Sequence, residues 1–101
     1  MAKWADYCIT AVRFNEKHTH IDQVKRRVDN GESLGETSIV SRQAVIADLK
    51  RGTSYVTVFK AADDKWNKGQ KVFIVTLNGT EYIKTVEDKI TKDNLDDLPE
   101  F

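Results

Sequence analysis

Two histidines separated by one residue offer the clearest start of a chemical site. His18 and His20 would place both imidazoles on one face of an extended chain, as the first two ligands of a metal site do. Such a site needs three or four converging ligands, and the local sequence supplies no third. Ser, His and Asp all occur, but a catalytic triad is a geometric arrangement that does not follow from their presence. We predict no enzyme activity, no cofactor and no metal site.

A second set of candidate ligands is acidic and lies near the C-terminus. Asp93, Asp96, Asp97 and Glu100 carry the carboxylate oxygens that calcium prefers. Their spacing departs from the twelve-residue calcium loop, and no glycine lies among them. We expect a solvated acidic face, because like charges this close normally remain in water.

The sequence has one basic run, Lys25-Arg26-Arg27. On a strand, Lys25 and Arg27 face one way and the middle residue faces the other. Arg13 and the basic pair at residues 50–51 could extend a positive patch that binds phosphates or an acidic protein, and a solvated sheet surface is the alternative. The formal net charge of zero disfavours a dedicated nucleic-acid binder but leaves a local patch open.

Aromatic side chains supply further binding candidates. Trp4 and Trp66 lie in segments predicted to be a terminus and a loop, and tryptophan is enriched at binding hot spots. The candidate binding surface comprises Arg13, Lys25, Arg27, Trp66, Tyr82 and Lys84.

Hydrophobic patterning predicts the elements that position these residues. Residues 7–14 are rich in β-branched and aromatic side chains, which predicts a strand, and the lone Cys8 is expected to be a small buried hydrophobe within it. Residues 18–28 fit both helical and strand spacing, but the short loop before them favours an antiparallel strand. Residues 53–60 alternate as a strand does, whereas residues 31–40 and 61–70 are predicted to be polar connections.

A single helix is predicted over residues 42–51. Ser41 can cap its N-terminus, because the hydroxyl can accept a hydrogen bond from the first turn. Val45, Ile46 and Leu49 fall on one face, and Gly52 supplies a left-handed stop.

The firmest turn signal is Asn78-Gly79, a pair suited to positive φ at both central positions of a type I′ hairpin. It predicts strands 71–77 and 80–85, with Leu77 opposite Thr80, Val75 opposite Tyr82 and Phe73 opposite Lys84. Leu95, Leu98 and Phe101 suit one helical turn that ends before Pro99 and packs on the sheet.

These elements predict a single α+β domain over residues 1–101. We expect an antiparallel sheet of about five strands with one helix on one face, in the order β-β-α-β-β-β, and a C-terminal tail packed on the sheet. Hydrophobic residues make up 40% and charged residues 32% of the chain, which is enough apolar material for one core. No apolar run could span a bilayer, and we expect a cytoplasmic protein.

Several short features along the chain resemble a family of small uncharacterised bacterial proteins, a domain of unknown function. They are Ile9-x-x-Val12-Arg13, His20-Ile21-x-x-Val24, Ser41-Arg42-Gln43-x-Val45-Ile46 running to Gly52, Tyr82-Ile83-Lys84-Thr85, and Asp93-Asn94-Leu95-x-x-Leu98-Pro99. The resemblance implies a stand-alone bacterial or phage-borne protein, and it brings no established activity, cofactor or catalytic residue.

With one helix, about half of the sheet would stay uncovered and available for contact. The sequence therefore favours a non-enzymatic protein-interaction module, an adaptor or inhibitor, with a protein partner or a second copy as its ligand and no membrane partner. The alternative is nucleotide or nucleic-acid binding through the basic patch on the sheet.

Overall fold

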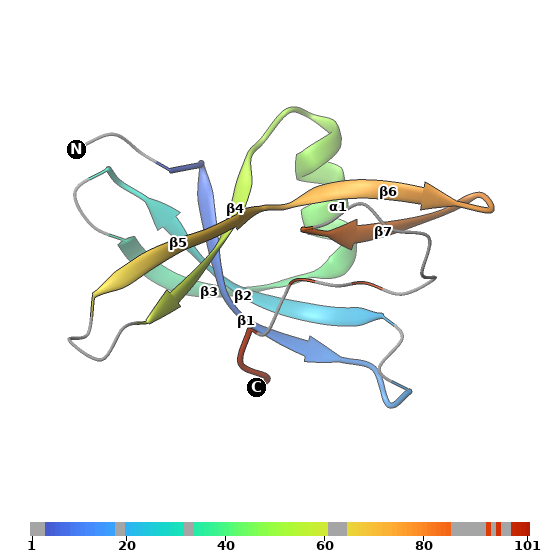
Figure 1. Cartoon of the computed structure of the whole chain (residues 1–101), viewed down its shortest axis with the longest axis horizontal. Helices are drawn as coiled ribbons and strands as arrows, with labels where there is room; N and C mark the ends of the chain where they lie inside the picture. The colour runs from blue at the N-terminus through green and yellow to red at the C-terminus, as the bar shows by residue number, and fades with distance from the viewer. Residues whose placement is uncertain are drawn as a thin grey trace.

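Figure 1 shows the computed structural model, which describes residues 4–17, 20–31, 34–60, 65–85, 93, 95 and 98–101. The fold is α+β, with one helix and mostly strands, as predicted. The described elements are β1 (Tyr7–Phe14), β2 (Ile21–Asp29), β3 (Leu34–Ser41), α1 (Arg42–Lys50), β4 (Tyr55–Lys60), β5 (Trp66–Lys71), β6 (Phe73–Leu77) and β7 (Thr80–Lys84).

The main sheet is mixed rather than antiparallel, and its membership differs from the prediction. Its five strands lie in the order β3-β2-β1-β4-β5, and β1 pairs with β4 in parallel. The hairpin β6-β7 forms a separate two-stranded sheet. The element order is therefore β-β-β-α-β-β-β-β, with two strands where polar connections were predicted.

These two strands, β3 and β5, were missed because both lie at an edge of the sheet. Most of their side chains are exposed or only half-buried, so they lack the apolar alternation that marks a strand with one buried face. The extra strand β3 also explains the parallel pairing. Because β1, β2 and β3 are successively antiparallel, β3 runs in the direction of β1. Helix α1 then carries the chain back, so β4 also runs in the direction of β1.

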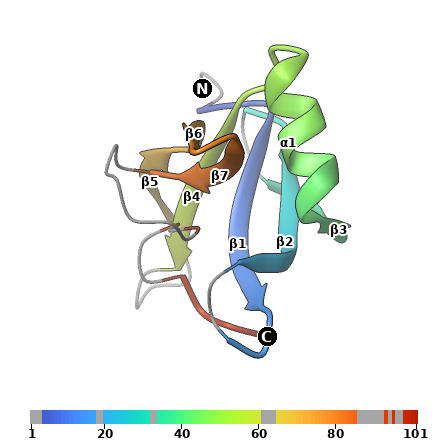
Figure 2. The same ribbon diagram turned by 90° about the vertical axis from the view of Figure 1, so that its right-hand side faces the viewer.

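The helix and the hairpin follow the predictions closely. The Ser41 hydroxyl accepts a hydrogen bond from the Ala44 backbone N–H at 3.2 Å, and Gly52 has a φ of +91°. Asn78 and Gly79 both have positive φ, and the hairpin has the predicted register. Figure 2 shows α1 and the hairpin on the same side of the main sheet.

The main core lies between this side of the sheet and the elements that cover it. Its buried members are Ile9, Val12, Ile21, Val24, Val45, Tyr55, Val72, Ile83, Leu95 and Leu98. The tail is thus packed against the body, as predicted, although part of the expected helical turn, residues 96–97, lies outside the described residues. Its last residues run beside β1, where Glu100 forms a parallel bridge with Val12.

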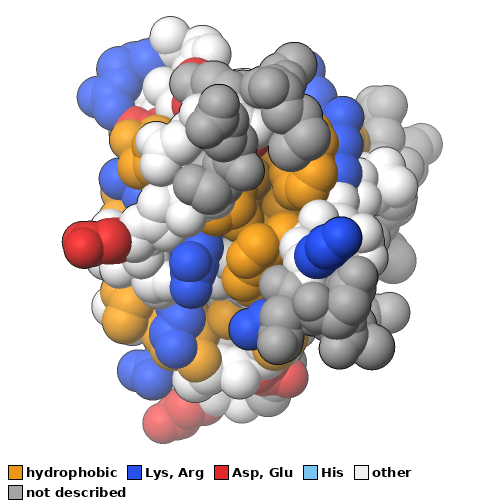
Figure 3. All heavy atoms as spheres, turned by 90° about the vertical axis from the view of Figure 1, so that its left-hand side faces the viewer, with side chains coloured by type: hydrophobic (Ala, Val, Ile, Leu, Met, Phe, Trp, Pro, Cys, Tyr) orange, Lys and Arg blue, Asp and Glu red, His pale blue; other side chains and the backbone are white. Residues whose placement is uncertain are grey.

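The opposite face of the sheet is not bare, as the sequence had suggested. A second, smaller cluster buries Ala5, Cys8, Val56 and Val58. Trp4, Leu34 and Trp66 pack against it. Apolar side chains therefore cover the sheet at this end, and long charged side chains surround them (Figure 3).

We expect Gly69→Ala to destabilise the fold by about 2 kcal/mol, as overpacking does. A Cβ atom at Gly69 would lie 2.3 Å from Thr57 Oγ1 and 2.7 Å from the Phe59 ring, so the β4–β5 pair would have to separate. Urea unfolding followed by tryptophan fluorescence measures the change. Gly35→Ala is the matched control, because its new Cβ would lie no closer than 3.3 Å to any atom, the nearest being in the Asn30 side chain. Equal losses in the two variants would contradict this account of the β4–β5 contact.

Candidate functional site

Strand register places three of the predicted surface residues on the face opposite α1. Arg27 lies across from Cys8, which belongs to the second cluster, so its side chain is on that face. Lys25 is two residues from Arg27 and shares this face. The register shift in β1 between Ile9 and Ala11 offsets its alternation by one residue, so Arg13 points to the same face. The expectation that the basic run splits between two faces is confirmed, because Arg26 instead reaches Asp48 and the Tyr7 ring on the helix side.

Strand β5 adds further cations to the same face. Lys68 lies across from Val58 and Lys71 lies across from Val56, and both valines belong to the second cluster. Both lysines are exposed. Figure 3 views this side of the molecule and shows Lys and Arg side chains on both sides of a strip of hydrophobic ones.

Two aromatic rings lie among these cations. The Arg13 guanidinium and the Lys25 ammonium are 4.7 and 4.8 Å from the centre of the Phe101 ring. Arg27 and Lys60 are 5.5 and 5.8 Å from the Trp66 ring. These distances are those of cation–π contacts, which hold the cations near the rings.

We call this surface the basic face: Arg13, Lys25, Arg27, Lys68, Lys71, Trp66 and Phe101. Every direct cross-strand partner of its five cations is a neutral residue. Within the part of the chain that the structure describes, none of these cations pairs with an Asp or Glu side chain. The basic face can therefore attract anions without first breaking an internal salt bridge.

The structure separates the remaining candidates from this surface. Tyr82 and Lys84 are 6% and 0% exposed on the hairpin, and the Tyr82 ring stacks on His20. The basic pair Lys50 and Arg51 contacts Glu81 and Asp48 on the helix side. The predicted surface thus divides into four residues that meet on the basic face and two that lie inside the fold.

Three members of the basic face were not among the binding residues predicted from the sequence. Lys68 was assigned to a loop and Lys71 to the start of the hairpin strand 71–77, so no register could place them beside Arg27. Phe101 was expected only to pack on the sheet with the rest of the tail, and its N–H donates to the Val12 carbonyl while its ring lies against Arg13 and Lys25. No local sequence signal identifies these neighbours, because the contacts join distant parts of the chain.

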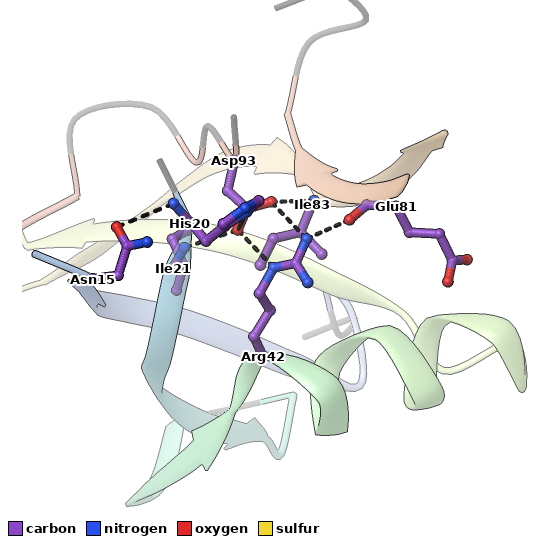
Figure 4. Close-up of polar contacts among 7 residues, drawn as sticks. All are labelled: Asn15, His20, Ile21, Arg42, Glu81, Ile83 and Asp93. Atoms are coloured by element: carbon purple, nitrogen blue, oxygen red, sulfur yellow. Dashed lines mark hydrogen bonds and ion pairs between the residues drawn. The ribbon is translucent and has the colours of Figure 1, made fainter. Parts of the chain in front are cut away.

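A buried carboxylate on the other side of the sheet ties four segments together. Asp93 Oδ2 accepts hydrogen bonds from Ile21 N at 2.8 Å and Arg42 Nε at 2.7 Å, and Oδ1 accepts from Ile83 N at 2.9 Å. Figure 4 shows Arg42 reaching this carboxylate from the start of α1. Asp93 is only 2% exposed, so the expected solvated acidic face is wrong at this position.

A second polar cluster joins α1 to the sheet. The Tyr55 hydroxyl donates to Asp48 Oδ2 at 2.7 Å, and Arg26 Nη1 donates to the same oxygen at 3.0 Å. The hydrogen bond from Tyr55, with those from Arg26 and Arg51, lowers the pKa of Asp48 despite its burial. Burial and the Asp48 carboxylate raise the pKa of Tyr55, so its hydroxyl stays protonated as a donor.

The described residues contain no group of three His, Cys, Asp or Glu side chains that could hold a metal ion. His18 lies outside the described residues. Cys8 is fully buried, as predicted, and desolvation together with the nearby Asp29 carboxylate raises the pKa of its thiol to about 12. A thiol that stays protonated at neutral pH is a poor nucleophile.

One catalytic signature is present that the sequence reasoning overlooked. Residues 31–35 read Gly-x-Ser-x-Gly, the pattern of a hydrolase nucleophile elbow. That elbow requires a strand followed by a helix, whereas this segment joins the antiparallel strands β2 and β3. Ser33 itself lies outside the described residues. The pattern therefore lacks the structural context that its chemistry needs.

Fold and site together define a small α+β domain whose mixed sheet carries a helix and a hairpin on one side and a basic, aromatic face on the other. Residues 8–99 match the family model described as protein of unknown function (DUF3892), and the chain belongs to that family. No curated protein and no solved structure matches the chain. No helix in the described part of the chain is long and apolar enough to cross a membrane.

We expect Asp93→Asn to lower the free energy of unfolding by about 3 kcal/mol, because the partly buried Arg42 guanidinium would lose the charge that compensates it. Urea unfolding measures the loss. Glu81→Gln is the matched control. It removes a carboxylate whose partner Lys50 is half-exposed, so a change below about 1 kcal/mol is expected. Similar losses in both variants would show that the Asp93 carboxylate is not a special anchor.

Asp48 should make folding stability sensitive to acid. Its pKa is lower in the folded state than its ordinary value of 3.8, so its contribution is complete above that value and is lost as pH falls through the folded-state pKa. We expect Asp48→Asn to be less stable than the native chain at neutral pH, and the gap to narrow on acidification. Urea titrations across this pH range measure the gap, and a constant gap would rule out this linkage.

Proposed function

We propose that this protein is a non-enzymatic binding module whose basic face binds single-stranded nucleic acid. The observation that carries the proposal is the placement of five cations and two aromatic rings on one side of one sheet. It revives the alternative that overall charge had disfavoured, because a chain with no net charge can still present a local group of cations on one side of its sheet.

The division of the charges supports an anionic ligand. On the helix side, Arg26, Arg42, Lys50 and Arg51 each contact a carboxylate. On the basic face, the cations contact aromatic rings and neutral neighbours, and Arg13 also donates to the main-chain oxygen of Phe101, the last residue. Phosphates approaching this face would meet positive charge, and counterion release would favour binding.

The aromatic rings support nucleic acid over an acidic protein. Single-stranded nucleic acids are bound by grooves or sheets that combine cations with rings on which bases stack. Trp66 and Phe101 are half-buried, so each ring keeps exposed surface beside its cations. An acidic peptide would use the charges and gain little from the rings.

Fluorescence anisotropy with a labelled single-stranded oligonucleotide, repeated over a salt series, tests the proposal. We expect binding that weakens as salt rises, because each phosphate contact releases counterions. The double variant Arg13→Gln/Lys25→Gln should reduce the slope of log affinity against log salt by about 1.4, which corresponds to two lost contacts. Phe101→Leu should lower affinity about tenfold and leave the slope unchanged, because it removes stacking alone.

Lys50→Gln/Arg51→Gln is the matched control, since it removes two cations from the opposite side of the molecule. It should bind as the native chain does. Equal effects of the two double variants, or binding that ignores salt, would refute the proposal. Competition by polyglutamate as effective as that by unlabelled oligonucleotide would also refute it and point to an acidic protein.

Protein interaction, as an adaptor or inhibitor, is the second candidate function. The exposed edge of β3 favours it, because this strand has a neighbour on one side only and carries the exposed Ile39. Capture of a stoichiometric protein partner that is lost on substitution of Ile39, with no affinity for oligonucleotides, would favour this function over the first.

A further inference from the structure

The two edges of the main sheet differ in how they are protected against pairing with another strand. The β5 edge carries Lys68 and Lys71, and lysine is a common guard of exposed edges. The β3 edge carries no lysine, arginine or proline in its eight residues, and Glu36 is its only charged residue. One edge is therefore guarded and the other is open.

One exposed apolar side chain lies on the unguarded edge. The large hydrophobic side chains that are exposed among the described residues are Val28 and Ile39, at 45% and 54%. Ile39 lies on β3 itself and on the basic face, whereas Val28 lies on the inner strand β2 and on the helix side. Residues 36–39 are all exposed, so nothing in the described structure covers the middle of this strand.

We infer that β3 pairs with β3 of a second copy of this chain to form an antiparallel dimer. A second copy presents the same open edge, so one two-fold interface would pair the free backbone N–H and C=O groups of both β3 strands. The formal net charge is zero, so two copies do not repel each other at long range. The dimer does not depend on nucleic-acid binding.

The symmetry restricts the register. A two-fold axis that joins two edges antiparallel must stand perpendicular to the sheet, so the basic faces of both copies lie on the same side. Residues that lie opposite each other then share a face, and one residue can lie opposite its own copy. The register with Ile39 on the axis joins the most exposed apolar side chains and places Ser38 across from Val40.

This register also avoids contacts between like charges. Glu36 of each copy lies three residues from the axis, beyond the end of the other copy's β3 at Ser41, so the two carboxylates do not meet. Lys25 lies across from Ile39 on the inner side of β3, and the basic face would continue from one copy to the next. The two faces would form one longer surface for a strand of nucleic acid.

Light scattering after size exclusion, without nucleic acid, tests the dimer. We expect the native chain to show twice its monomer mass of 11.5 kDa. Ile39→Lys should be monomeric with an unchanged far-ultraviolet circular dichroism spectrum, because two lysines would face each other at the axis. Val28→Lys is the matched control: it replaces the other exposed hydrophobe on a strand whose two edges are already paired, and it should stay dimeric.

Oxidative cross-linking tests the register. Directly opposite residues have Cα atoms about 4.5–5.5 Å apart, which suits a disulfide, so Ile39→Cys should yield a covalent dimer. Val28→Cys should not, and the native chain should not, because Cys8 is buried. A monomeric native chain would overturn the inference. A dimer that survives Ile39→Lys, or that cross-links through residue 28 instead, would overturn it as well.

Discussion

The carboxylate of Asp93 is the constraint on which the helix side of this fold depends. It comes from the C-terminal tail and binds the first residue of β2, the backbone of β7 and the side chain at the start of α1. A fully buried carboxylate is stable only with such partners, because desolvation alone would cost several kcal/mol. The Asp93–Arg42 ion pair therefore joins the C-terminal tail, β2, β7 and α1, which share few other contacts. Leu95 and Leu98 add apolar packing between the tail and the core.

On the helix side of the sheet, arginine side chains are paired with carboxylates, whereas cations on the basic face have no Asp or Glu partner among the described residues. Arg42 and Arg26 are occupied by Asp93 and Asp48, where they join α1 to the strands. The acidic residues used in these clusters are not available to the opposite face, where Arg13 and Lys25 contact the Phe101 ring instead. A chain with no net charge thus acquires a basic surface through the distribution of its ion pairs.

The edge strands explain both the errors in the predicted fold and the candidate interfaces. A strand with one neighbour needs no alternating apolar pattern, so β3 and β5 resemble polar loops in sequence. The strand β5 then contributes Lys68 and Lys71 to the basic face, and β3 contributes the open edge. The parts of the chain that were hardest to predict are those that face outward, where contact with other molecules takes place.

Local chemistry made several features readable from the sequence alone. They include the helix between Ser41 and Gly52, the Asn78-Gly79 hairpin with its register, the strands β1, β2 and β4, and the burial of Cys8. Each rests on a cap, a turn or a periodicity that neighbouring residues determine. The tertiary structure alone decided the parallel β1–β4 pairing, the burial of Asp93 and the meeting of Arg13, Arg27 and Trp66 with Phe101, Lys68 and Lys71 on one face. These depend on contacts between residues far apart in the chain, which local patterns do not encode.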